Sequence, residues 1–321
     1  MRWRVGLWAV VALLALPAVA LTAARLSGSD DGLVIKAVSF TPAGVLLYAA
    51  CLLVLVALLL RPGGRGRRAP AVLAVLVAAG LATHVAWVAP WYVGGPAAAS
   101  GSTPLRVMSA NMLGDEGDGT ALVAAAADAD VDVLAVQEMS EGTLAAMERS
   151  GLTELFPHRA GEAAATGVRG TMVFAREPIT DVERLPTVMG SWSVEIDGLR
   201  IFVVHPAYPL HPEDWRVELA ALLEAAEATR PDLMLGDFNA TLDHGPMRAF
   251  LDAGYRDAAE LAGEGWQPTW PADGAGIVGL VPPLVQIDHV LVPDGWTAAS
   301  TRTVHIPGAD HRALVAEVSP G

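Results

Sequence analysis

The chain has 321 residues, of which 53% are hydrophobic and 17% charged, and its formal net charge at neutral pH is −14. The first 100 residues hold eight basic and two acidic residues, a net of +6, whereas the remainder holds 13 basic and 33 acidic residues, a net of −20. Unless its charge is distributed very unevenly, a domain this acidic is expected to repel a polyanion, which disfavours a nucleic-acid-binding protein. The single cysteine, Cys51, excludes an intrachain disulfide, so the acidic part must be stabilised by its own core.

Three apolar segments occupy the first third of the chain, at about residues 5–21, 40–60 and 71–93. Each is long enough to cross the hydrocarbon core of a bilayer as a helix, which takes roughly 20 residues. We therefore predict a three-span transmembrane anchor over residues 1–93. For the first segment alone, a cleaved signal peptide is the alternative, because Ala18-Val19-Ala20 resembles a cleavage site.

The distribution of basic residues predicts the orientation of this anchor. Arginines gather before the first segment and between the second and third, at Arg2, Arg4, Arg61, Arg65, Arg67 and Arg68. In the loop between the first and second segments, two acidic residues offset the two basic ones. Loops rich in arginine stay in the cytoplasm. We therefore expect a multi-pass protein of the plasma membrane, with a cytoplasmic N-terminus and an extracytoplasmic C-terminal domain.

Residues 94–104 are rich in Gly, Pro and Ser and predict a flexible linker. Beyond it, residues 105–321 alternate between apolar strands and helices. We predict strands at 105–110, 131–136, 171–175, 192–196, 199–204, 233–235, 286–292 and 314–318, and helices at 121–128, 141–148, 212–229 and 247–253. Hairpins, such as the one at Asp197-Gly198, mix with crossovers. This mixture favours an α/β (α+β) fold, a four-layer αββα sandwich of two packed mixed sheets, over a single doubly wound sheet.

Polar residues follow or interrupt many of the predicted strands. They are Asn111, Glu138, His205, Asp237, Asn239, Asp288, Asp310 and His311. Any one of them alone would be explained as a cap, a turn residue or a packed polar group. Because strand ends on one rim of a sheet can converge, their presence in one domain predicts a hydrolytic site that uses a metal ion.

Several of these residues lie in motifs that resemble the endonuclease/exonuclease/phosphatase superfamily over about residues 105–318. The motifs are Asn111, Gln137-Glu138, His205-Pro206, Gly236-Asp237-Phe238-Asn239, Ile287-Asp288-His289-Val290-Leu291 and Asp310-His311. The three-span anchor and Thr269-Trp270-Pro271 look closest to a membrane-bound bacterial branch that includes the glycopeptide-resistance protein VanJ. The resemblance implies hydrolysis of a phosphate ester or phosphoanhydride bond, with a link to antibiotic resistance.

The resemblance also implies a metal site formed by Glu138, Asn111 and Asp310. Their oxygen atoms suit Mg²⁺, with Mn²⁺ as the alternative ion. The metal would polarise the phosphoryl oxygen and offset charge in the transition state.

Five further residues receive catalytic roles from the same resemblance. Asp237 would orient or deprotonate the attacking water, and Asn239 would hold a phosphate oxygen or that water. His311 would contact the phosphate and transfer a proton, while Asp288 would fix its tautomer and raise its pKa. His205 would be a second acid/base or phosphate-contacting group.

The expected partners are the lipid bilayer and a phosphate-bearing lipid, with undecaprenyl pyrophosphate as an example and a phospholipid phosphodiester as the next candidate. Two other functions stay open. One is a membrane-anchored extracytoplasmic nuclease, which the acidic charge makes unlikely. The other is a non-catalytic envelope binding protein, which would be expected to have lost its metal site. The sequence suggests no protein partner.

Overall fold

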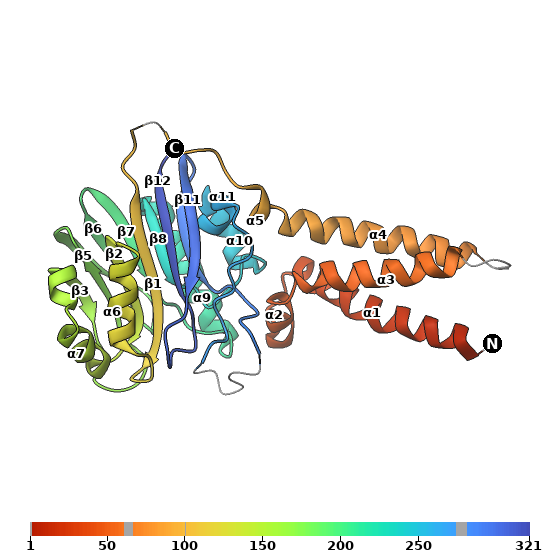
Figure 1. The fold of residues 1–321 in the computed structure, drawn as a ribbon, viewed down its shortest axis with the longest axis horizontal. Helices are drawn as coiled ribbons and strands as arrows, with labels where there is room; N and C mark the ends of the chain where they lie inside the picture. Colours follow the sequence, from red (N-terminus) through yellow and green to blue (C-terminus); the bar gives the residue numbers. More distant parts are fainter. Residues whose placement is uncertain (1, 61–66, 100, 274–280) are drawn as a thin grey trace. The chain divides into compact units, whose positions relative to one another are not determined.

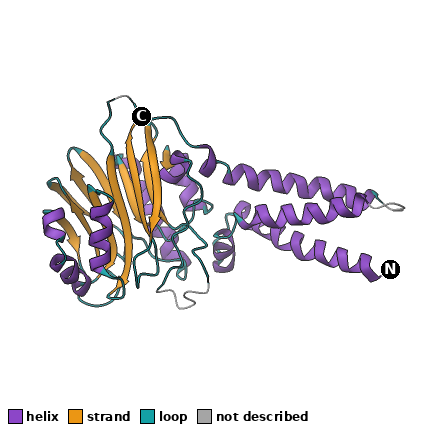
Figure 2. Cartoon of the chain, in the orientation of Figure 1, coloured by secondary structure: helices purple, strands orange, loops and turns teal. Residues whose placement is uncertain are grey.

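A computed structural model describes residues 2–60, 67–99, 101–273 and 281–321. Arg61 and Arg65, on which part of the orientation prediction depends, lie outside the described residues. The chain divides into a helical unit, Met1–Pro90 with Asp243–Gly245, and a β-rich unit, Trp91–Leu242 with Pro246–Gly321. All the described strands lie in the β-rich unit (Figure 2).

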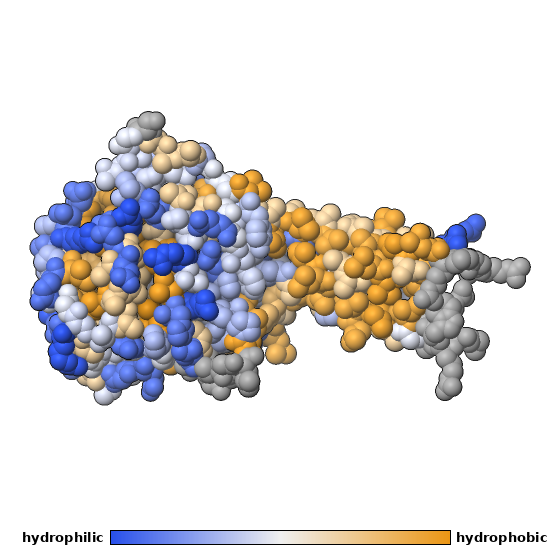
Figure 3. Space-filling view, in the orientation of Figure 1, coloured by the Kyte–Doolittle hydropathy of each residue, from blue (hydrophilic) through white to orange (hydrophobic). Residues whose placement is uncertain are grey.

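The helical unit contains the three long apolar helices that were predicted. Its helices are α1 (Arg2–Ser27), α2 (Gly32–Val38), α3 (Ala43–Leu60) and α4 (Arg68–Val88). Segments of 22, 18 and 21 residues in α1, α3 and α4 are each long and apolar enough to span a membrane. The surface of these helices is correspondingly apolar (Figure 3). The first helix runs beyond its predicted end at residue 21, and α4 stops at Val88 before the short α5 (Pro90–Val93).

Glycines allow close packing inside the helical unit. A Cβ on Gly44 would overlap the ring of His84, and a Cβ on Gly80 would overlap the ring of Tyr48. Both of these polar side chains bond to Thr22: His84 Nε2 lies 2.9 Å and the Tyr48 hydroxyl 2.8 Å from Thr22 Oγ1. Since unpaired polar groups are costly in an apolar medium, the unit satisfies these side chains internally.

The β-rich unit consists of two six-stranded mixed sheets. The first sheet has the order β11-β12-β1-β2-β4-β3 and the second the order β5-β6-β7-β8-β10-β9. The strands of the first sheet are β1 (Leu105–Gly114), β2 (Val133–Met139), β3 (His158–Glu162), β4 (Thr171–Ala175), β11 (Trp296–Val304) and β12 (Ala313–Pro320). Those of the second are β5 (Ile179–Leu185), β6 (Ser191–Ile196), β7 (Leu199–Val204), β8 (Leu233–Asp237), β9 (Tyr255–Asp257) and β10 (Asp288–Pro293).

Alternate apolar residues of the two sheets face one another and form the central core. Val107, Val133 and Val173 contribute from the first sheet, and Val203 and Leu235 from the second. On the outer faces, α6 (Gly119–Asp128), α7 (Glu141–Arg149) and α8 (Leu152–Leu155) cover the first sheet, and α9 (Pro212–Thr229) and α10 (Gly245–Asp252) the second (Figure 1). The predicted four-layer αββα sandwich is confirmed. The short α11 (Ala258–Ala262) follows β9.

Strand pairing brings the predicted site residues to one rim. β1 and β2 run parallel and place Asn111 opposite Gln137, next to Glu138. β7 and β8 also run parallel, and β10 pairs antiparallel to β8 with Asp288 directly opposite Asp237. Because parallel neighbours end at the same edge, the polar residues after these strands converge.

The segment that enters the β-rich unit is bonded to it. The Trp91 carbonyl accepts a hydrogen bond from the Gly265 amide at 2.7 Å, and the Pro96 carbonyl accepts one from Thr297 Oγ1 at 2.5 Å. The predicted boundaries of the anchor, the flexible linker and the catalytic domain stay predictions.

Candidate active site

The strand that ends in Asp237 requires a glycine just before its end. Gly236 has φ 149°, a conformation that residues with a side chain rarely adopt, and a Cβ there would overlap the Val204 carbonyl oxygen on β7. The apolar residues Leu233 to Leu235 bury this strand, so Asp237 is carried into the interior and is only 1% exposed.

Asp237 is held by two amide groups. Its Oδ1 accepts a hydrogen bond from the Asn239 backbone amide at 2.7 Å, and its Oδ2 accepts one from Asn111 Nδ2 at 3.1 Å. Asn111 Nδ2 also donates to Glu138 Oε1 at 3.1 Å. Since Asn111 belongs to the first sheet and Asp237 to the second, this network joins the two sheets. Asn239 directs its side-chain amide to the Pro206 carbonyl at 3.1 Å.

Burial raises the pKa of Asp237 to about 7, although the positive charge of His311 opposes that rise. A carboxylate that titrates near neutrality is suited to accept a proton at physiological pH. Asp237 therefore has the environment of a general base.

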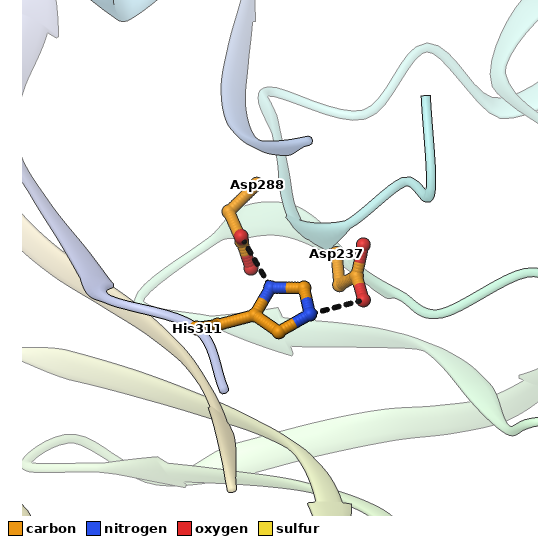
Figure 4. A group of neighbouring side chains, drawn as sticks. All are labelled: Asp237, Asp288 and His311. Carbon is orange, nitrogen blue, oxygen red and sulfur yellow. Dashed lines mark hydrogen bonds and ion pairs between the residues drawn. The ribbon is translucent and has the colours of Figure 1, made fainter. Parts of the chain in front are cut away.

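His311 lies between two carboxylates (Figure 4). Its Nδ1 donates to Asp288 Oδ2 at 2.8 Å, and its Nε2 lies 3.7 Å from Asp237 Oδ2. Burial favours the neutral ring, but the nearby negative charges outweigh it and raise the pKa of His311 to about 10. His311 is therefore a buried imidazolium at neutral pH. Thr269 Oγ1 orients Asp288 by accepting a hydrogen bond from its backbone amide at 3.3 Å.

His205 has the opposite electrostatic character. Its side chain is fully buried, and neither ring nitrogen has a hydrogen-bond partner among the described residues. Burial and then the charge of His311 lower the pKa of His205 to about 3, so the ring is neutral at physiological pH. Its Nε2 lies 3.8 Å from Asp237 Oδ2 and 3.9 Å from Glu138 Oε1, which places it beside both acids.

Two of the three predicted metal ligands, Glu138 and Asp310, carry a buried oxygen that lacks a hydrogen-bond donor among the described residues. Glu138 Oε2 and Asp310 Oδ1 are both buried without a hydrogen-bond partner in the described part of the chain. Burial also raises the pKa of Glu138, which shows how poorly its charge is solvated. A buried carboxylate oxygen with no donor is costly, and a divalent cation would remove that cost. The free oxygens of Glu138 and Asp310 thus fit a hard metal ion, whereas Asn111 Oδ1 accepts a hydrogen bond from the Leu113 backbone amide at 3.1 Å and its part in a metal site stays a prediction.

The family of this chain follows from its similarity to known proteins. The model of the Endonuclease/Exonuclease/phosphatase family matches residues 108–311, nearly all of the β-rich unit. The chain belongs to this family. It is a metal-dependent phosphoesterase, and its buried acidic and histidine residues form the divalent-metal site that is typical of the family.

Solved structures of other proteins share the fold of the β-rich unit. A family member from Bacteroides thetaiotaomicron is 14% identical, with a TM-score of 0.53, over 68% of this chain and 99% of its own. The D. rerio protein TDP2, solved with a single-strand DNA product, is 15% identical, with a TM-score of 0.54, over 67% and 99%. The Neisseria 3′ phosphatase NExo, bound to a product DNA hairpin, is 18% identical, with a TM-score of 0.54, over 66% and 98%. No curated protein matches this chain.

A second group of residues at this family site could also hold a metal ion. Ligand atoms of Asp237, Asp288 and His311 lie within 4.8 Å of one another. However, His311 Nδ1 is bonded to Asp288 Oδ2 at 2.8 Å, so both of these groups already have a partner. The chemistry of the donors therefore favours Glu138, which has an unpaired oxygen.

The structure brings all eight predicted residues to one rim of the sandwich, while the individual role of each stays a prediction. Two supporting residues were not predicted, Thr269 and Glu218. Glu218 is buried in α9 and accepts backbone hydrogen bonds from Val188 and Ala207 at 3.0 and 2.7 Å. Its helical spacing from Trp215 was a usable signal, because both lie on the buried stripe of α9. Thr269 lies in the Thr269-Trp270-Pro271 segment that carried part of the resemblance, but no role in the site was predicted for it.

Two unusual backbone conformations help to shape this rim. Glu138 and Asn239 have φ of 51° and 52°, a region that residues other than glycine seldom occupy. Such conformations cluster at functional sites, where the surrounding structure enforces them. Glu138 lies near the end of β2 and Asn239 lies just after β8, so both conformations turn the chain where a strand ends.

Proposed function

We propose that this protein is a membrane-anchored, Mg²⁺-dependent phosphohydrolase that acts outside the cytoplasm on a lipid-linked phosphate or pyrophosphate of the cell envelope. The observation that carries the proposal is a phosphoesterase site in an acidic domain whose chain is continuous with three helices able to span a membrane. A net charge of −20 beyond residue 100 disfavours a polyanionic substrate. A substrate held in the bilayer, in contrast, need not be attracted from solution.

The resemblance to the branch that includes VanJ supports a lipid carrier, such as undecaprenyl pyrophosphate, as the substrate. It rests on the anchor and on Thr269-Trp270-Pro271. A role in antibiotic resistance is part of this proposal, and the glycopeptide sensitivity of cells that lack the protein would test it. Arginines at Arg2, Arg4, Arg67 and Arg68 support an external catalytic domain.

The side chains have complementary tasks in such a reaction. Mg²⁺ held by Glu138, Asn111 and Asp310 would polarise a phosphoryl oxygen and offset developing negative charge. Asp237 orients the attacking water and accepts its proton, which its raised pKa permits. Asn239 lies beside Asp237 and holds that water or a phosphate oxygen.

The two histidines act in different protonation states. His311, a cation at neutral pH, contacts a phosphate oxygen and transfers a proton to the leaving group, while Asp288 fixes its orientation through Nδ1. The neutral ring of His205 contacts phosphate or takes part in proton transfer as a second acid/base.

A nuclease is the second candidate, since two of the structurally similar proteins were solved with DNA. Direct hydrolysis assays distinguish the lipid phosphohydrolase from the nuclease. Full-length, detergent-solubilised protein should release phosphate from undecaprenyl pyrophosphate or the head group from a phospholipid, with Mg²⁺ or Mn²⁺ and not with EDTA. The same preparation should leave single-stranded DNA intact.

The His311→Gln variant is the matched control for a contaminating enzyme, because it should lose the lipid activity. Turnover of DNA alone would replace our proposal with the anchored nuclease. A folded, metal-loaded protein that hydrolyses none of these substrates would favour the non-catalytic binding protein.

A further inference from the structure

We infer that an apolar rim beside the catalytic site rests in the surface of the bilayer, so that the site takes its lipid substrate directly from the membrane. This inference rests on the proposed function and adds how the substrate reaches the site. The apolar rim consists of Val188, Tyr208, Leu210 and Val217, which are 51%, 38%, 65% and 56% exposed.

The segments that carry these four residues are joined through Glu218. Its two carboxylate oxygens accept hydrogen bonds from the backbone amides of Val188, at 3.0 Å, and Ala207, at 2.7 Å. Val217 precedes Glu218 on α9, and Tyr208 follows Ala207. Leu210 lies in the turn that the His211 amide closes on the Tyr208 carbonyl at 3.1 Å.

The same segments are bonded to catalytic residues. The Pro206 carbonyl, two residues before Tyr208, accepts a hydrogen bond from the Asn239 side chain at 3.1 Å. The backbone amide of His205 donates to Ser191 Oγ at 2.8 Å, and Thr187 Oγ1, beside Val188, donates to the same oxygen at 2.8 Å. The segments that carry the apolar rim are therefore bonded directly to residues of the candidate active site.

The charge pattern explains why a bilayer would meet the domain here. Residues 185–194 and 201–212, which carry Val188, Tyr208 and Leu210, contain no Asp, Glu, Lys or Arg, although the chain beyond residue 100 carries a net charge of −20. The fourth residue, Val217, lies on α9, where the exposed Glu213, Asp214 and Arg216 mark the charged border of the rim. An acidic domain is repelled by an anionic lipid surface, and the repulsion is smallest where the domain is uncharged. Exposed leucine and valine then gain free energy by entering the apolar phase, and tyrosine favours the interface.

The chain itself keeps a bilayer within reach. α4 ends at Val88, and the β-rich unit begins at Trp91, so only two residues lie between them. At about 3.5 Å per extended residue, this junction holds the start of the unit within roughly 10 Å of the end of the helix. The bilayer crossed by the helices is therefore the occupant to which we assign the apolar rim, as for other amphipathic surfaces.

Lipid-quenched fluorescence tests the inference without any enzyme assay. In full-length protein with Cys51→Ala, Leu210→Cys would be labelled with the fluorophore NBD and reconstituted into vesicles of phosphatidylcholine and phosphatidylglycerol. We expect blue-shifted emission at Leu210 and strong quenching by phosphatidylcholine that carries a doxyl group at carbon 5 of its acyl chain. Leu53→Cys, 71% exposed on α3, is the positive control. Thr153→Cys, exposed on α8 over the first sheet, is the negative control.

Each pattern of quenching gives a distinct answer. Quenching at Leu53 and Leu210 but not at Thr153 supports the inference, whatever substrate is later found. Quenching at Leu53 alone overturns it while leaving the proposed function intact, and a blue shift at Leu210 without lipid quenching would assign the rim to a protein surface. Equal quenching at all three sites, or none at Leu53, would overturn the inference together with the picture of a domain held at a bilayer surface.

Discussion

The removal of one carboxylate should separate catalysis from folding. In Asp237→Asn, we expect kcat to fall by about 10²–10⁴-fold, the range that general-base catalysis contributes. Thermal stability should change little, because the substitution also removes a poorly solvated buried charge. Substrate turnover and thermal unfolding of the same preparation measure the two effects. Retention of wild-type turnover would exclude Asp237 as the base.

The charge of His311 can be measured directly. Its pKa is raised to about 10, so the stability that its charge contributes is fully present below the ordinary pKa near 6.5 and is lost as pH rises through 10. NMR of metal-free, histidine-labelled protein should show one imidazole titrating near 10. Asp288→Asn should lower that pKa by about one to three units, because it removes the carboxylate bonded to Nδ1.

The control for this titration is Asp273→Asn, which removes the carboxylate 2.6 Å from Nε2 of the exposed His305. It should leave the His311 signal unchanged. A His311 that titrates near 6.5 in the wild-type protein would contradict the assignment of a buried imidazolium.

The two candidate sets of metal ligands predict that different substitutions weaken metal binding. If Glu138, Asn111 and Asp310 hold the metal, Glu138→Gln should weaken Mn²⁺ binding by at least about 10-fold, whereas Asp288→Asn should have a much smaller effect. The electron paramagnetic resonance signal of free Mn²⁺ reports the affinity of both variants. A larger loss in Asp288→Asn would assign the metal to Asp237, Asp288 and His311 instead.

The candidate site residues could be predicted from sequence because each lies beside or within an apolar run: Asp237 follows Leu233 to Leu235, whereas His311 precedes the strand at 314–318. What could not be predicted is their protonation. His205 and His311 are both histidines at strand ends, yet burial without a partner lowers one pKa and two carboxylates raise the other. That difference depends on neighbours in three dimensions, such as Asp237, whose carboxylate lies 3.7 Å from His311 Nε2 although the two residues are far apart in the chain.

At the level of single elements, the parallel pair of β7 and β8 depends on Gly236. Gly236→Ala should destabilise the fold by about 3 kcal/mol, because the new Cβ would overlap the Val204 carbonyl in a backbone conformation with φ 149°. Gly198→Ala is the matched control: Gly198 also has a positive φ, 76°, but has open space around it, so the cost should be only about 1–2 kcal/mol. Urea unfolding of the two variants measures the difference, and equal losses would contradict the steric explanation.

The strands that sequence patterns did not predict share one property. β3, β5, β9 and β11 are the edge strands of the two sheets, whereas the eight predicted strands are all interior. Interior strands are packed on both faces and therefore have long apolar runs, such as Thr171 to Ala175, which is buried at every position. An edge strand such as β5 is largely exposed and mixes charged with apolar residues, as natural proteins require to avoid edge-to-edge association. Its sequence therefore resembles that of a loop.

For the whole molecule, the arginine distribution predicts the side of the membrane on which the domain lies. A phosphatase or fluorescent reporter fused after Gly321 should report an extracytoplasmic location, because three crossings follow a cytoplasmic N-terminus. Replacement of Arg67 and Arg68 by glutamine should weaken this orientation, and the same change at Arg216 and Arg248 in the β-rich unit should not. A cytoplasmic signal from the unmodified chain would overturn both the orientation and the external substrate.

The position of β12 in its sheet has a consequence for biosynthesis. β12 is the last of the described strands in chain order, yet it lies in the interior of the first sheet, between β11 and β1. The sheet therefore cannot close, and Asp310 and His311 cannot meet Asp288, until almost the whole domain has emerged from the ribosome or the translocation channel. A nascent chain or one truncated before β12 should therefore be hydrolytically silent.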